Sequence, residues 1–172
     1  HLIKIEFRNF TIENLTKTDW INQFNKSQQE EIMLGLEKGL NISWYANKDF
    51  NSNQMWFIRL GLESNVDVSI YADLKYNENQ MLQILYGLEK KLDVSWYVNP
   101  KFIDSKMEQI KLDLEDKLDV SWYAKPEFNL YQMKQIRLGL LNNIDVSTYA
   151  KKELNWKKMR EIREELLKKS TL

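Results

Sequence analysis

Hydrophobic and polar positions along this chain follow a pattern that repeats every 26 residues. From Phe24 onward, an aromatic residue, a short polar stretch and a run of apolar residues recur in the same order. Within the repeat 50–75, Met55, Ile58 and Leu62 fall at spacings of three and four, which places them on one face of a helix. Self-similarity at a fixed period of this length is typical of repeat architectures. The pattern therefore predicts stacked repeats, each with one amphipathic helix of about 13 residues.

The repeat register divides the chain into three regions. The complete repeats are 24–49, 50–75, 76–101, 102–127 and 128–153. Together they span 24–153, with a divergent leader or cap at 1–23 and a truncated capping repeat at 154–172, since terminal repeats of a solenoid differ from inner ones. Within the leader, 2–7 alternates weakly, like a strand, and 14–23 resembles a degraded copy of the segment that ends each repeat.

Each predicted long helix carries signals for a capped start. An Asn at the N-cap is followed three residues later by a Gln, which can complete a capping box, and an aromatic residue and a Met flank them as a hydrophobic staple. These Asn–Gln pairs are Asn25 and Gln28, Asn51 and Gln54, Asn77 and Gln80, and Asn129 and Gln132. In the repeat 102–127, Ile103 takes the Asn position, and we expect Asp104 to take over the cap.

The same helices carry signals at their interior and at their end. A Gly inside a helix destabilises it by about 1 kcal/mol relative to Ala, so a recurrent one indicates close approach of another backbone. These glycines are Gly35, Gly61, Gly87 and Gly139, and Asp113 holds the position in the remaining repeat. The helices should end at a left-handed residue, a conformation that suits Gly and Asn better than Lys. The residues at that position are Gly39, Asn65, Lys91, Lys117 and Asn143.

A near-identical hexapeptide closes each repeat. It is Asp-Val-Ser-x-Tyr-Ala or a close variant, starting at residues 67, 93, 119 and 145, with a looser copy starting at residue 41. We interpret it as one or two turns of α- or 3-10 helix, with the Asp as its cap and the Ser bonded to local backbone; an extended strand is the alternative, because Val, Trp and Tyr favour sheets. Trp44, Trp96 and Trp122 share one position in it, either packed in the core or aligned as an aromatic row on a groove. The predicted fold class is all-α: an α-solenoid in which six long helices alternate with short ones.

Composition and charge exclude several function classes. The chain is 43% hydrophobic and 29% charged, which is typical of a globular protein rather than a disordered one. Lys+Arg and Asp+Glu both number 25, so there is no basic surplus of the kind that nucleic-acid binders usually carry. No Cys occurs and the single His is His1, so the usual metal ligands and acid–base groups are missing. We therefore expect no enzyme activity, no metal and no cofactor, and the lack of a long apolar run predicts no membrane span.

The outer face of the predicted helices suggests a site for a protein partner. The sixth residue after each repeat start should point outward, and the ninth should lie near it. In the first three repeats these six positions hold Glu30 and Arg59 together with four apolar residues. The apolar residues, Met33, Trp56, Leu82 and Leu85, form a stretch of the kind that often marks a partner site. The alternative is that the N-terminal segment folds back over this stretch. Homo-oligomerisation through the same surface is a further possibility.

The later repeats suggest a different partner. Lys111, Arg137 and Arg163 occupy the ninth position in successive repeats, and Lys157 and Arg160 lie close by in sequence. Stacked helices would align these cations into a basic ridge along a phosphate backbone. Nucleic-acid binding is therefore the alternative function, although the acidic residues among them and the overall neutrality of the chain argue for local ion pairs instead.

Two stretches resemble a known short repeat. The string from Gln132 to Leu140, followed by Asp145 to Ala150, is similar to a repeat of proteins encoded by phages and integrative elements of low-GC bacteria. The alternation of long and very short helices also resembles solenoids of the leucine-rich repeat variant class. The resemblance implies an interaction module associated with mobile elements, which we expect in the host cytoplasm, either alone or within a longer parent protein.

Overall fold

The protein consists of long α-helices that alternate with single turns of 3-10 helix. The computed structural model describes residues 18–171, in which six α-helices and six 3-10 helices occur and no strand is found. In chain order they are η2 (Asp19–Gln23), α3 (Lys26–Glu37), η3 (Ile42–Trp44), α4 (Ser52–Glu63), η4 (Val68–Ile70), α5 (Glu78–Glu89), η5 (Val94–Trp96), α6 (Asp104–Glu115), η6 (Val120–Trp122), α7 (Leu130–Leu141), η7 (Val146–Thr148) and α8 (Trp156–Ser170). The prediction of an all-α helical-repeat fold with a period of 26 residues is confirmed.

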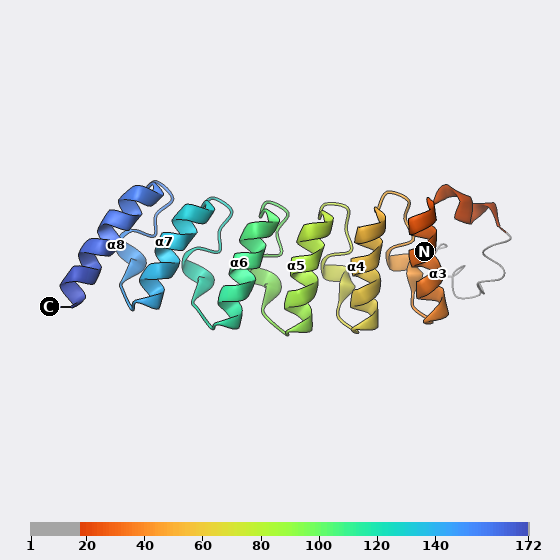
Figure 1. Cartoon of the computed structure of the whole chain (residues 1–172), viewed down its shortest axis with the longest axis horizontal. Coiled ribbons are helices and arrows are strands. Elements are labelled where there is room, and N and C mark those ends of the chain that lie inside the picture. Colours follow the sequence, from red (N-terminus) through yellow and green to blue (C-terminus); the bar gives the residue numbers. More distant parts are fainter. Residues whose placement is uncertain (1–17, 172) are drawn as a thin grey trace. The chain divides into compact units, whose positions relative to one another are not determined.

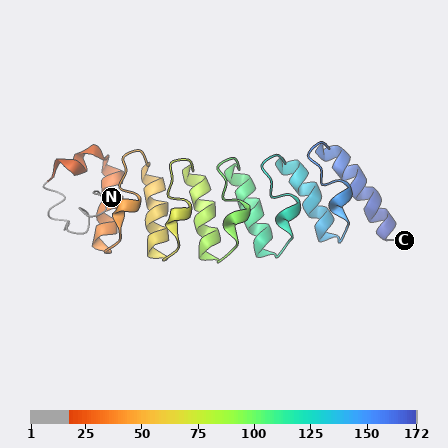
Figure 2. The same ribbon diagram turned by 180° about the vertical axis from the view of Figure 1, so that it is seen from behind.

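The chain divides into two compact units, with the boundary between Lys91 and Leu92. In the first unit, α3, α4 and α5 lie side by side in chain order, and η3 and η4 line one side of that layer (Figure 1). In the second unit, α6, α7 and α8 are arranged in the same way, which the reverse view also shows (Figure 2). Each unit therefore has the two-layer arrangement of an α-solenoid, with long helices in one layer and 3-10 helices in the other.

Capping boxes start the long helices, as predicted. The Asn25 side chain accepts a hydrogen bond from the Gln28 backbone N–H, and the Gln28 side chain accepts one from the Asn25 backbone N–H. The Gln28 amide also donates to the carbonyl of Phe50 at 2.6 Å, 22 residues further on. Gln54 donates to the carbonyl of Tyr76 in the same way, at 2.8 Å. One glutamine therefore both caps its own helix and ties it to the next repeat.

The start of α6 departs from the prediction. Ile103 is the N-cap and provides no side-chain hydrogen bond, while Asp104 is already the first helical residue. The expectation that Asp104 takes over the cap is wrong, because a residue inside the first turn supports the helix through its charge near the N-terminus rather than by capping. Lys106 replaces the capping glutamine, and its ammonium donates to the carbonyl of Pro126 at 2.9 Å. The link to the following segment is thus retained without the capping box.

The long helices end in a left-handed residue at the predicted positions. In α3, the Leu40 N–H donates to the Gly35 carbonyl and the Gly39 N–H donates to that of Leu36, which is the Schellman arrangement. Gly39 has a φ of +67°. The equivalent residues Asn65, Lys91, Lys117 and Asn143 have φ between 56° and 60°. Two lysines are therefore held in a conformation that is unfavourable for a residue with a Cβ.

The hexapeptides form 3-10 turns, so the strand alternative is wrong. In η4, the Asp67 carboxylate accepts from the backbone N–H of Ser69 at 3.1 Å, as expected of a cap. The Ser69 hydroxyl donates to the same carboxylate rather than to local backbone, which corrects the role predicted for it. Val68 and Tyr71 are buried. The turn is therefore fixed by an Asp–Ser pair outside and by two core side chains inside.

The recurrent glycine makes room for a tyrosine hydroxyl. Tyr71 donates to the carbonyl of Phe57 at 2.9 Å, and a Cβ at Gly61 would lie 2.0 Å from the Tyr71 oxygen. The close approach predicted at this glycine is real, but a side chain of the same repeat makes it, not a backbone. The same arrangement occurs at Gly35 with Tyr45 and at Gly139 with Tyr149.

The leader is described only from residue 18 onward. The proposed strand at 2–7 lies outside the described residues, as does the first part of 14–23. The described part of 14–23 contains η2, a 3-10 helix that ends directly before Phe24, whereas η3 ends six residues before Phe50. The resemblance of 14–23 to a closing segment stays a prediction. At the other end, Asn155 caps α8, which at 15 residues is longer than the preceding helices of 12.

Candidate recognition surface

The residues predicted to bind a protein do not form one exposed patch. In the first unit, Trp56 is 41% exposed, Met33 and Leu82 are half-buried, and Leu85 is only 1% exposed. The exposure predicted for Leu85 is wrong, because the ninth position of a repeat faces the preceding long helix rather than solvent. Trp56 and Leu82 remain at the surface, at equivalent positions of α4 and α5.

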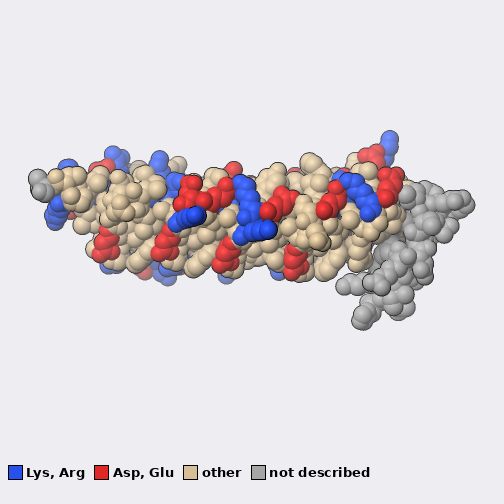
Figure 3. All heavy atoms as spheres, turned by 90° about the horizontal axis from the view of Figure 1, so that it is seen from below, with Lys and Arg blue, Asp and Glu red and all other residues tan. Residues whose placement is uncertain are grey.

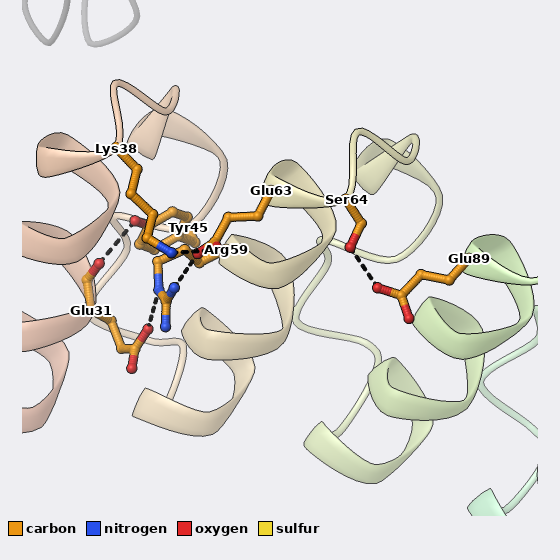
Figure 4. Close-up of polar contacts among 7 residues, drawn as sticks. All are labelled: Glu31, Lys38, Tyr45, Arg59, Glu63, Ser64 and Glu89. Atoms are coloured by element: carbon orange, nitrogen blue, oxygen red, sulfur yellow. Dashed lines mark hydrogen bonds and ion pairs between the residues drawn. The ribbon is translucent and has the colours of Figure 1, made fainter.

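Arg59 shows that a residue at the ninth position of a repeat can connect two neighbouring long helices. It is 6% exposed and its guanidinium lies between two carboxylates, Glu31 of α3 at 2.7 Å and Glu63 of its own helix (Figure 4). Lys38 adds a second cation to Glu63 at 2.6 Å. Burial alone would raise the pKa of Glu63, but the hydrogen bonds from Lys38 and Arg59 outweigh it and hold that pKa below its ordinary value. This cluster ties α3 to α4, and no pattern in the sequence near Arg59 predicts it.

A second link of this kind ties α4 to α5. The Ser64 hydroxyl, at the end of α4, donates to the Glu89 carboxylate at 2.6 Å (Figure 4). At the start of the same helix, Asn51 and Asn53 donate to the Glu78 carboxylate at 2.9 and 3.2 Å. Neighbouring helices of the first unit are thus connected by polar contacts at both ends.

The predicted basic ridge does not exist as an exposed surface. Lys111 is 7% exposed, Arg137 and Arg163 are half-buried, and the guanidinium of Arg163 donates to the Gln135 side chain at 3.2 Å. These side chains occupy the ninth position, so the correction made for Leu85 applies to them as well. Lys157 and Arg160 are exposed, since they lie elsewhere on the helix surface.

Arg137 instead compensates a buried acid. Asp113 stands where other repeats have glycine, is 0% exposed and forms an ion pair with Arg137. The Tyr123 hydroxyl donates to Asp113 at 2.7 Å, and the Gln109 amide donates to it at 3.1 Å. Burial raises the pKa of Tyr123, and the hydrogen bond to Asp113 raises it further. The repeat tolerates a carboxylate in its interior because three donors surround it.

The tryptophans of the closing segments lie at the surface. Trp96 and Trp122 are exposed and Trp44 is half-buried, so the core-packing interpretation is wrong for the first two. The hexapeptide turns its Val and Tyr into the core, which leaves the residue between Ser and Tyr on the outside. Trp96 and Trp122 lie in the second unit, one repeat apart.

The outer surface of α7 and α8 combines exposed aromatic and basic side chains. Tyr131 is 63% exposed, and its ring lies against that of Trp156 with centroids 5.6 Å apart. Lys157 lies over the Trp156 ring, and the exposed Lys134 follows one turn after Tyr131 on α7. This cluster was not identified from the sequence, because Tyr131 and Trp156 hold different positions in their repeats.

Charges on the face where the long helices end are mixed. Figure 3 shows Lys and Arg side chains interleaved with Asp and Glu there, without a continuous basic area. At the ends of α3 and α4, Lys38 and Glu63 form a direct ion pair.

Within residues 18–171, no group of three or more His, Cys, Asp or Glu side chains could hold a metal ion. No helix in that range is both long enough and apolar enough to cross a membrane. Comparisons with protein-family models, with curated proteins and with solved structures found no match.

Proposed function

We propose that this chain is a non-enzymatic helical-repeat module for protein–protein recognition. The observation that carries the proposal is a contrast between constant and variable positions. Capping and core residues recur from repeat to repeat, whereas the sixth position, which points outward, varies among acidic, apolar and basic residues. The residues there are Glu30, Trp56, Leu82, Glu108, Lys134 and Arg160. A constant scaffold with a variable outer face is how repeat proteins build extended binding surfaces.

Within the first unit, Trp56 is the best candidate anchor, with Leu82 beside it. Exposed aromatic side chains at the centre of an interface often account for about 2 kcal/mol or more of binding energy. Trp56 also stacks on Phe57, with ring centroids 5.1 Å apart, which holds the indole in place before a partner arrives. The resemblance to repeats of mobile elements directs the search for a partner to phage or element-encoded proteins and to their bacterial host.

A comparative pull-down tests this proposal. The intact chain and its Trp56→Ala/Leu82→Ala variant are used as bait, with Leu74→Ala as control, since Leu74 is exposed in a loop of the same unit. We expect a discrete partner with wild type and control and a strongly reduced yield with the double variant. Equal yields from all three baits would exclude this surface, and light scattering would identify a partner that is a second copy of the chain.

Nucleic-acid binding is the second candidate, because the C-terminal part of the chain is basic. Residues 130–171 contain 10 Lys and Arg against 5 Asp and Glu. Of the cations first considered, Lys157 and Arg160 remain exposed, but Arg160 pairs with Glu164 at 2.7 Å. A phosphate binder loses affinity steeply with salt. A gel shift with mixed DNA and RNA at low salt tests this function, and the absence of a shift would exclude it.

A further inference from the structure

Two shallow hollows flank the N-terminal half of α7 in the second unit. The hollow toward α6 has a volume of about 460 Å³ and is lined by Gln109, Leu130, Tyr131, Lys134 and Arg137. The hollow toward α8 has a volume of about 340 Å³. Its lining includes Tyr131 and Lys134 again, together with Trp156 and Arg160. Tyr131 and Lys134 therefore stand on the ridge between the two hollows and are accessible from both.

The floor and walls of these hollows offer an apolar seat. Tyr131 is 63% exposed, and its ring and that of Trp156 lie at 31° to one another. Leu130 is exposed beside them. An aromatic pair of this kind contacts a flat or aliphatic side chain with little loss of conformational entropy, since both rings are already held.

The charge at the same place is positive but small. Arg137 is paired with Asp113, and both Arg160 and Arg163 lie near Glu164, at 2.7 and 3.7 Å. Lys134, in contrast, has no hydrogen-bond or ion-pair partner within the described residues. Lys157 has only the ring of Trp156 next to it among the described contacts. Two ammonium groups thus have no carboxylate partner among the described residues, and one of them lies between the hollows.

The exposed basic side chains of α7 and α8 have no counterpart at the equivalent positions of α6. On α6, the positions equivalent to Leu130 and Lys134 are held by Asp104 and Glu108. A polynucleotide that followed the stack would meet these carboxylates after one helix. Phosphate binding also draws its affinity from many contacts at once, and two free ammonium groups are too few for that. A short segment with one or two carboxylates matches the available charge.

We propose that the hollows on either side of Tyr131 bind a short acidic peptide segment of a partner protein. An aromatic or large aliphatic side chain of the peptide packs on Tyr131 and Trp156, and a neighbouring Asp or Glu pairs with Lys134. This inference rests on the proposed function and adds to it the chemistry of the ligand and the place where it binds.

Peptide selection on the intact chain tests the inference. Short random peptides are displayed and selected on wild type, and enriched peptides are synthesised with a fluorophore and measured by anisotropy. We expect enriched peptides to contain an aromatic or large aliphatic residue next to Asp or Glu. Tyr131→Ala and Lys134→Glu should each weaken binding about tenfold or more. The matched controls are Leu141→Ala, an exposed apolar truncation at the other end of α7, and Lys125→Glu, an exposed charge reversal in a loop. Both should bind like wild type.

The salt dependence of binding distinguishes a peptide ligand from a nucleic acid, and the variants that lose binding show which surface is used. The peptide should lose less than about tenfold in affinity between low and moderate salt, whereas a strand contacting six or more phosphates would lose about a thousandfold. Tight, strongly salt-dependent binding of oligothymidylate that requires Lys134 would overturn the peptide in favour of a nucleic acid. Selected peptides that are lost with Trp56→Ala but not with Tyr131→Ala would overturn this site and leave the proposed function intact. No enriched peptide, together with no partner in the pull-down, would overturn both.

Discussion

Replacing Gly61 with Ala tests the tight contact between the long helix and its closing turn. The added methyl group would lie 2.0 Å from the Tyr71 hydroxyl oxygen and 2.8 Å from Val68 Cγ1. To relieve the overlap the hydroxyl must move, which breaks its 2.9 Å hydrogen bond to the Phe57 carbonyl. Overpacking costs about 1–3 kcal/mol and the lost buried hydrogen bond about 1 kcal/mol, while alanine regains about 1 kcal/mol of helix propensity. We expect a net loss of about 2 kcal/mol in the free energy of unfolding.

A second substitution distinguishes this explanation from a general loss of stability. Tyr71→Phe removes the nearest atom and alone should destabilise by about 1 kcal/mol. The Gly61→Ala/Tyr71→Phe double variant should then be more stable than Gly61→Ala, although the contact with Val68 remains. Urea denaturation followed by circular dichroism measures all three. Additive losses, or a Gly61→Ala variant as stable as wild type, would refute the reasoning, and Gly139 with Tyr149 offers an independent copy of the experiment.

Other contacts lead to equally direct expectations. Arg137→Met leaves the Asp113 carboxylate buried without its cation and should cost about 3–5 kcal/mol in unfolding experiments; restoration of stability by a further Asp113→Gly would establish the cause, and an unaltered single variant would contradict it. Lys117→Gly should raise the melting temperature by a few degrees, because a φ of 60° strains the folded lysine by about 1 kcal/mol, and the greater freedom of glycine in the unfolded chain offsets only part of this gain. Gly39→Ala, at the equivalent position, should lower the melting temperature. Burial raises the pKa of Tyr149 from 10.0 to about 12, against an opposing effect of the nearby Arg163. Because the unfolded chain releases this proton first, the associated stability is complete below pH 10 and is lost as the pH rises from about 10 to 12. Thermal melts across that range should show a smaller loss in Tyr149→Phe than in wild type.

Features with a local signal could be predicted from the sequence. The capping box needs only Asn25 and Gln28, three residues apart, and the register then carries it to every other copy. The left-handed position was found at Lys91 and Lys117 because Gly39 marks it in another repeat, even though lysine itself gives no such signal. The helical nature of the closing hexapeptide followed from the Asp cap, against the sheet preference of its other residues.

The packing side of each helix could not be predicted in the same way. The sixth and ninth positions of a repeat are only about 60° apart on a helical wheel, so periodicity does not tell which of them meets the neighbouring helix. Leu85 and Arg59 were therefore placed at the surface. The partner that draws Arg59 inward, Glu31, lies 28 residues earlier, and nothing near Arg59 in the sequence points to it.

The aromatic and basic cluster on α7 and α8 was missed for a related reason. Tyr131 and Trp156 differ by one position in the repeat, and only the stacking of the two helices brings their rings together. The general basic character of this region was apparent from composition. The sequence could not show which cations are paired, because the contacts with Asp113 and Glu164 depend on the positions of the side chains in the folded protein.

The short reach of the contacts between repeats also affects how such a chain can change length. Gln28 contacts a residue 22 positions away and Arg59 one 28 positions away, so in each case a repeat contacts the repeat next to it. After recombination that duplicates or removes whole repeats, each repeat would therefore still make the same kinds of contact with its neighbour. The buried Asp113 sets one condition for such an event, because it needs a cation from the following repeat.

In the second unit, the ninth position of each repeat supplies such a cation. If residues 128–153 were lost, the repeat that carries Arg163 would follow Asp113, and Arg163 would take the place of Arg137. If 102–127 were duplicated, Lys111 of the second copy would face Asp113 of the first. A cation at the same position of three successive repeats thus makes the buried Asp113, which replaces a helix glycine, compatible with gain or loss of the neighbouring repeats.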